Sequence, residues 1–81
     1  MSAKTYFTVH AVQKRGRRLE NVQPISCRSD SHAIARAERD ARRFQGVIAV
    51  RQVADDETGD LLEEPVVLAV HGEFPMEALG I

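Results

Sequence analysis

Alternation of residue type predicts that the chain begins with a β-hairpin. Residues 5–13, TYFTVHAVQ, are rich in β-branched and aromatic residues and alternate between two faces of an extended chain. A short loop at Lys14-Arg15-Gly16 follows, where glycine suits the left-handed position of a type I turn with a bulge. The return strand, about residues 19–28, contains Pro24, which has no N–H to donate. We therefore expect this strand at an edge of the sheet or at a bulge.

Helical periodicity replaces the alternation in residues 29–46, SDSHAIARAERDARRFQG. Ser29, Asp30 or Ser31 can cap the start of a helix, and Gly46 supplies its end. One apolar stripe is expected to face the sheet, formed by Ala33, Ile34, Ala37, Ala41 and Phe44.

Two continuous apolar runs predict two further strands. Residues 47–54, VIAVRQVA, and 65–71, PVVLAVH, are typical of strands covered on both faces, with a turn at Glu57-Thr58-Gly59 between them. A short C-terminal turn of helix is expected from Pro75 to Leu79, because proline suits the first helical position.

The predicted architecture is a single α+β domain, residues 1–81, with the element order β-β-α-β-β. Placing Pro24 at an edge favours a four-stranded antiparallel sheet in the order 2-1-3-4, with one helix on one face. In this arrangement the two hairpin turns emerge at opposite ends of the sheet. The uncovered face predicts a homodimer, formed through this face or through an edge strand. Its apolar residues are expected to be Tyr6, Val12, Ile48, Val50 and part of 66–70.

Both turns share the pattern G-x-x-L-E, which begins at Gly16 and again at Gly59. Either the chain contains a duplicated hairpin unit, or two ordinary hairpins use the same turn residues.

The net charge of −1 conceals two halves of opposite sign. Residues 1–51 carry eleven bases and four acids, a net +7, whereas residues 52–81 carry eight acids and no base, a net −8. Such a distribution is typical of a surface that binds polyanions, or of a contact directed by charge. The candidate polyanion or partner contacts are Lys14, Arg15, Arg17, Arg18, Arg39 and Arg43. An acidic partner surface is expected at Asp55, Asp56, Glu57 and Asp60.

The helical wheel places Arg36, Arg39 and Arg43 on the outer face, where they are either a solvated surface or phosphate contacts. An aromatic content of 5%, without RNP-like or KH-like motifs, favours the solvated surface.

Few residues suggest chemistry. His10, His32 and His71 are scattered, so no metal site and no cofactor are expected. Cys27 is the only cysteine, and without an assigned base it is expected to be a small strand residue. A lone thiol and the absence of a leader or membrane-length apolar run predict a cytoplasmic protein.

Three functions follow in order of preference. The first is a non-enzymatic interaction or accessory module that forms a homodimer, and the second is a nucleic-acid or other polyanion-binding module. The third is an enzyme with a site at the dimer interface.

Overall fold

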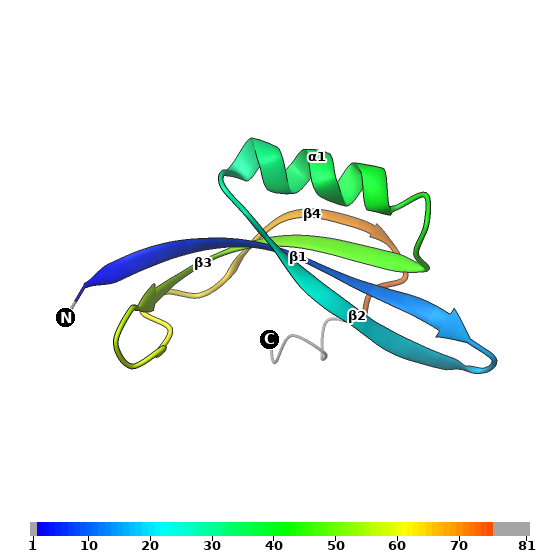
Figure 1. The fold of residues 1–81 in the computed structure, drawn as a ribbon, viewed down its shortest axis with the longest axis horizontal. Coiled ribbons are helices and arrows are strands. Elements are labelled where there is room, and N and C mark those ends of the chain that lie inside the picture. Colours follow the sequence, from blue (N-terminus) through cyan, green and yellow to red (C-terminus); the bar gives the residue numbers. More distant parts are fainter. Residues whose placement is uncertain (1, 76–81) are drawn as a thin grey trace.

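Four strands and one helix make up the fold of residues 2–75, the part of the chain that the computed structural model describes (Figure 1). The strands form one antiparallel sheet in the order β2-β1-β3-β4, and the helix packs on one face of it. This confirms the predicted α+β class and strand order. The elements are β1 (Ala3–Arg15), β2 (Arg18–Cys27), α1 (Asp30–Asp40), β3 (Gly46–Asp55) and β4 (Val66–Gly72).

The long central strand β1 sets the layout of the molecule. It pairs with β3 from Ala3 opposite Asp55 to Val12 opposite Gly46, and with β2 along its other edge. The β1–β2 turn and the β3–β4 connection therefore lie at opposite ends of a molecule 44 Å long, as predicted (Figure 1). An irregularity in the β1–β2 pairing, between Val9 and Ala11, falls opposite the part of edge strand β2 that contains Pro24.

Ser29, one of the three residues predicted as possible caps, begins the helix, because its hydroxyl accepts the backbone N–H of His32 at 3.1 Å. Arg51 on β3 donates to Asp30 at 2.7 Å and ties the first turn to the sheet. The helix ends at Asp40, earlier than the glycine stop predicted. The backbone N–H groups of Arg42 and Arg43 bond to the carbonyls three residues earlier, of Arg39 and Asp40, so the chain tightens into turns here instead of continuing as regular α-helix.

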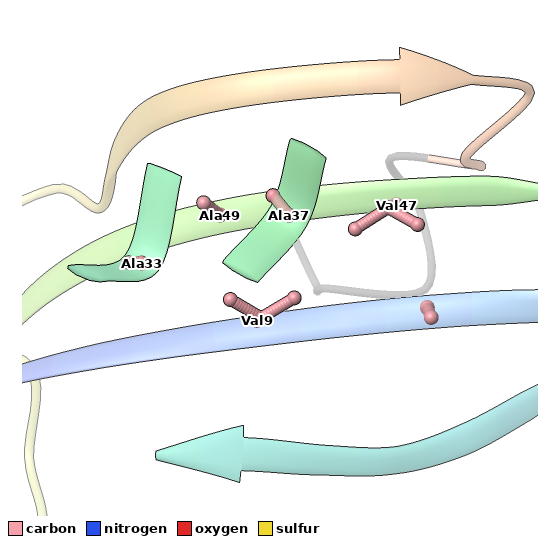
Figure 2. Packing of buried hydrophobic residues seen from close by; sticks show 6 residues of the cluster. Val9, Ala33, Ala37, Val47 and Ala49 are labelled. Carbon is pink, nitrogen blue, oxygen red and sulfur yellow. The ribbon is translucent and has the colours of Figure 1, made fainter. Parts of the chain in front are cut away.

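Small and β-branched side chains fill the space between helix and sheet. Ala33 and Ala37 pack against apolar residues of β1 and β3 in one cluster (Figure 2). The alanines, which have no side chain beyond Cβ, allow the helix to approach the strands closely. The strand residues of this cluster are Val9, Ala11, Val47 and Ala49.

The predicted helical stripe is correct in part. Ala33 and Ala37 are fully buried, whereas Ile34 is 39% exposed and lies outside the cluster. The buried position at the end of the helix is taken by Asp40. Ile34 was predicted in the core because it is hydrophobic. The orientation of the helix instead places the two alanines against the sheet.

The sheet face away from the helix is not bare, which corrects the prediction. Val12, Ile48 and Val50 are at most 1% exposed in the single chain, although none belongs to the helix-side cluster. Tyr6 remains exposed on β1. Leu19 on β2 is exposed too, and three valines of β4 are exposed, so the prediction that residues 65–71 are covered on both faces is also wrong.

The chain returns to the start of β3 after β4 ends. The Glu73 N–H donates to the Gln45 carbonyl at 3.1 Å, and the backbone of Glu73 and Phe74 lies directly against Gly46. A Cβ at this glycine would overlap the Glu73 carbonyl. The helical turn predicted from Pro75 to Leu79 lies outside the described residues.

We expect Gly46→Ala to lower the free energy of unfolding by about 1–3 kcal/mol, because the added methyl group meets backbone that cannot rotate away. Urea denaturation measures the change. Gly16→Asn is the control: Gly16 has a φ of 64° and open space around it, and asparagine tolerates this conformation. Equal stability of the Gly46→Ala variant and the wild type would show that the contact with Glu73 is absent in solution.

Candidate functional site

The first hairpin extends beyond the body of the sheet as a two-stranded ribbon. Past Val12, which pairs with Gly46, β1 has no partner on β3, while its pairing with β2 continues. Three residue pairs project in this way, the last being Arg15 opposite Arg18. At about 3.4 Å per residue the ribbon is roughly 10 Å long. We call residues 13–20 the basic arm (Figure 1).

The turn of the basic arm is shorter than predicted and one residue later. Arg15 and Arg18 still pair, so Gly16 and Arg17 alone form the loop. Gly16 has a φ of 64°, and no other described residue of the arm has a positive φ. A two-residue loop with glycine first matches the right-handed twist of the flanking strands, which explains why it replaces the predicted bulged turn. The left-handed glycine itself is confirmed.

All four cations of the arm are accessible. Lys14, Arg15, Arg17 and Arg18 are exposed. The described residues supply one ion pair to the arm, Arg15 to Glu20 at 3.5 Å, in which the Arg15 side chain is 78% exposed. Such an exposed pair contributes at most about 1 kcal/mol and leaves the guanidinium available. The arm therefore presents an excess of positive charge to solvent.

The helix ends at the same end of the molecule as the arm (Figure 1). It runs back over the sheet from the end of β2 to the start of β3, where Gly46 pairs with Val12 at the base of the arm. Arg39 lies in the last turn of the helix, and Arg42 and Arg43 lie in the turn that follows the helix. All three side chains are exposed. We call the arm cations and these three arginines together the basic end: Lys14, Arg15, Arg17, Arg18, Arg39, Arg42 and Arg43.

The arginines of the basic end differ in setting. Arg39 and Arg42 border a shallow hollow of about 260 Å³, shared with Ala35 and Glu38 on the outer side of the helix. The Arg43 guanidinium lies 5.4 Å from the centre of the Phe44 ring. Arg42 is absent from the predicted contacts, because a longer helix would turn it to one side. The sequence pattern did not show that the helix ends early, at Asp40, and it therefore did not identify Arg42.

Arg36 does not belong to this surface, contrary to the helical-wheel prediction. Its Nε donates to the Asp40 carboxylate at 3.0 Å, and Asp40 is 1% exposed. The other carboxylate oxygen, Oδ1, has no partner among residues 2–75. Because a buried carboxylate needs a counter-charge, Arg36 is held by Asp40 rather than free for a ligand.

We call residues 55–60, at the end of β3 and just after it, the acidic turn. It lies at the end of the molecule opposite the basic end (Figure 1). Asp56, Glu57 and Asp60 are exposed there, as an acidic surface requires. Asp55 is 2% exposed, and its Oδ1 accepts the N–H groups of Glu57 and Thr58 at 2.8 and 3.1 Å. Asp55 thus shapes the turn and is not available as a surface contact.

The two turns that share the G-x-x-L-E pattern have different structures. Gly16 belongs to a two-residue loop, whereas the Gly59 N–H closes on the Asp55 carbonyl at 2.8 Å within a connection of ten residues. The same residue pattern therefore occurs in two different backbone conformations.

Cys27 and the histidines take structural positions. Burial raises the pKa of the Cys27 thiol, while Arg36 lowers it and Asp40 raises it; the net increase is the opposite of an activated nucleophile. His10 pairs with Ile48 and His71 with Val47, so the two rings leave opposite faces of the sheet. Within residues 2–75 no three His, Cys, Asp or Glu side chains are grouped as metal ligands.

Comparison with protein-family models, curated proteins and solved structures finds no match to this chain. Among the described residues, no helix has the length and apolar character needed to cross a membrane. Functional inference therefore depends on the geometry above.

We expect stability to fall as the pH drops from about 7.5 to about 5.5, because His10 is partly buried. Burial holds the pKa of His10 below its ordinary 6.5. The unfolded chain therefore takes up a proton first, and stability is complete above 6.5 and declines below it. Thermal denaturation of His10→Gln should show a weaker pH dependence than the wild type. Thr8→Ser, on the same face, is the control. An unchanged slope in His10→Gln would contradict the assignment.

Proposed function

We propose that this chain is a non-enzymatic binding module whose basic end binds the phosphate backbone of a nucleic-acid duplex. The observation that supports it most is the gathering of seven accessible cations, from two separate segments, at one end of the molecule. Both segments were candidate contacts in the sequence, and the fold brings them to the same end.

The acidic turn does not neutralise this end, and among the described residues of the acidic half Glu73 alone lies near the base of the arm, beside Gln45. The two turns lie at opposite ends of a molecule 44 Å long, whereas the Debye length at physiological ionic strength is about 8 Å. A phosphate at the arm therefore experiences the local positive charge and little of the acidic turn. The formal net charge of −1 thus does not argue against polyanion binding.

The shape of the arm favours a DNA duplex. The major groove of B-form DNA, about 12 Å wide and 8.5 Å deep, admits a two-stranded β-ribbon, and a ribbon roughly 10 Å long matches its depth. The major groove of A-form RNA is too narrow for side chains to read. Single-strand binding depends on exposed aromatic rings that stack on bases. At the basic end the ring of Phe44 is half-buried.

The other functions predicted from the sequence receive less support from the structure. A homodimer through the whole outer face loses its basis, because Val12, Ile48 and Val50 are buried within the chain. Dimerisation through an edge strand stays open and is developed below. An enzymatic site at a dimer interface gains no support from residues 2–75. The cytoplasmic location stays a prediction from the single cysteine.

We expect the affinity for duplex DNA to fall steeply with salt, with a slope of about −4 in log K against log salt for four to five phosphate contacts. Fluorescence anisotropy with a labelled duplex measures this. Arg17→Glu should weaken binding by about 3- to 10-fold and reduce the slope by about 1, and Arg17→Glu with Arg18→Glu should abolish binding.

The control is Lys4→Glu, which changes the net charge equally but lies at the start of β1, away from the arm. It should leave binding unchanged. Equal weakening by Lys4→Glu and Arg17→Glu would attribute binding to net charge rather than to the basic end. No binding at about 50 mM salt would refute the proposal outright.

A further inference from the structure

The two edges of the sheet differ in how well they are protected. Edge strand β2 contains Pro24, two charged residues and an irregular pairing, all of which discourage another strand from adding to it. Edge strand β4, VVLAVHG, contains no proline and no Asp, Glu, Lys or Arg. Its Val66, Val67 and Val70 are 43%, 39% and 49% exposed. An apolar edge strand without such residues is an open template for strand pairing.

Among the described residues, nothing pairs with the outer backbone of β4. Its ladder to β3 uses one edge, and within residues 2–75 no other backbone hydrogen bond is made by Val66–Gly72. The helix and β3 hold the strand in place, so its free N–H and C=O groups are already arranged for a partner strand. We propose that the partner is β4 of a second copy of this chain, paired antiparallel about a two-fold axis to form an eight-stranded sheet.

The sequence of β4 is complementary to itself in this orientation. The pairing with β3 skips Leu68, because Ala49 faces Ala69 and Val50 faces Val67. Leu68 and Ala69 pack on the helix side, whereas Val67 and Val70 pair with Val50 and Ile48, which lie outside the helix-side cluster. An axis between residues 68 and 69 sets Val67 opposite Val70 of the second copy. It also sets Leu68 opposite Ala69 of the second copy, so that apolar residues meet on both faces.

The irregularity at Leu68 limits the strength of the pairing. A bulge twists an edge and is one way in which proteins blunt it. Seven residues also make a short contact. We therefore expect a reversible dimer with a Kd of about 10–100 µM rather than an obligate one.

Charge favours the antiparallel orientation over the parallel one. The two-fold axis places the acidic turn of one copy at the same end as the basic end of the other, whereas parallel pairing would bring like charges together. The two hairpins would lie about four strand spacings apart, roughly 19 Å. This distance exceeds the Debye length of about 8 Å at physiological salt but not the 30 Å at 0.01 M. Charge therefore favours this orientation at low salt only, and the apolar edge provides the affinity at any salt concentration.

Sedimentation equilibrium at about 10–300 µM tests the proposal on the whole chain. We expect the molar mass of the wild type to approach twice the monomer value. Val67→Lys with Val70→Lys sets like charges opposite each other and should leave a monomer. Val67→Lys with Val70→Glu sets opposite charges across the axis and should restore the dimer. Leu19→Lys, at an exposed position on β2, should dimerise like the wild type.

Each result decides the proposal. A monomeric wild type at the highest concentration overturns it, and so does a dimer that survives the two lysines. Restoration by the lysine–glutamate pair separates the proposed register from a general loss of apolar surface. Circular dichroism melting confirms that the variants fold, and both positions are already partly exposed in the monomer. Binding of duplex DNA is measured separately through Arg17→Glu, so either proposal can fail alone.

Discussion

The antiparallel pairing of β1 with β3 is the constraint on which the rest of the structure depends. Its register, from Ala3 opposite Asp55 to Val12 opposite Gly46, sends the two hairpin turns to opposite ends of the sheet. The same register leaves the last three residues of β1 beyond the start of β3. The arm, the separation of charge and the place where the helix ends are consequences of this one alignment.

Strand β3 is the centre of the core because both of its faces are covered. Val47 and Ala49 meet the helix, and Ile48 and Val50 are buried on the other face. Each fully buried valine or isoleucine contributes about 1.5–3 kcal/mol relative to the exposed side chain. A chain of 81 residues thus builds a two-sided core without a second subunit. No partner is needed to explain how this chain buries Val12, Ile48 and Val50.

Local signals were sufficient to predict much of the fold. Pro24 correctly placed β2 at an edge, the capping residues 29–31 correctly marked the start of the helix, and Gly16 was correctly predicted to be left-handed. Each of these depends on a property of one residue: a missing N–H, a hydroxyl acceptor, or freedom from Cβ strain. The two tips and the helix arginines were also found in the sequence, because charge is visible there.

The errors concern packing between segments that lie far apart in the chain. Ile34 was expected inside but is 39% exposed, whereas Asp40 is buried with Arg36 as its counter-charge. The i,i+4 spacing of Arg36 and Asp40 is visible in the sequence, but it does not show that Asp40 faces the sheet rather than solvent. The outer face was expected to be bare, because alternation shows which residues share a face but not what covers them. Ile48 is buried while its neighbour Val70 on the edge strand β4 is exposed. The sequence alone does not show this difference between the two strands.

The separation of charge determines how the two proposals would interact. In an antiparallel β4 dimer, the basic ends point to opposite ends of the eight-stranded sheet, so a single straight duplex would not engage both at once. The acidic turn of the second copy would lie roughly 19 Å from each basic arm. At physiological salt this distance is more than two Debye lengths, so dimerisation and phosphate binding would be nearly independent. At 0.01 M salt the acidic turn would compete with phosphate for the arm, and dimerisation would weaken binding. Because linkage is reciprocal, bound DNA would then weaken the dimer by the same factor.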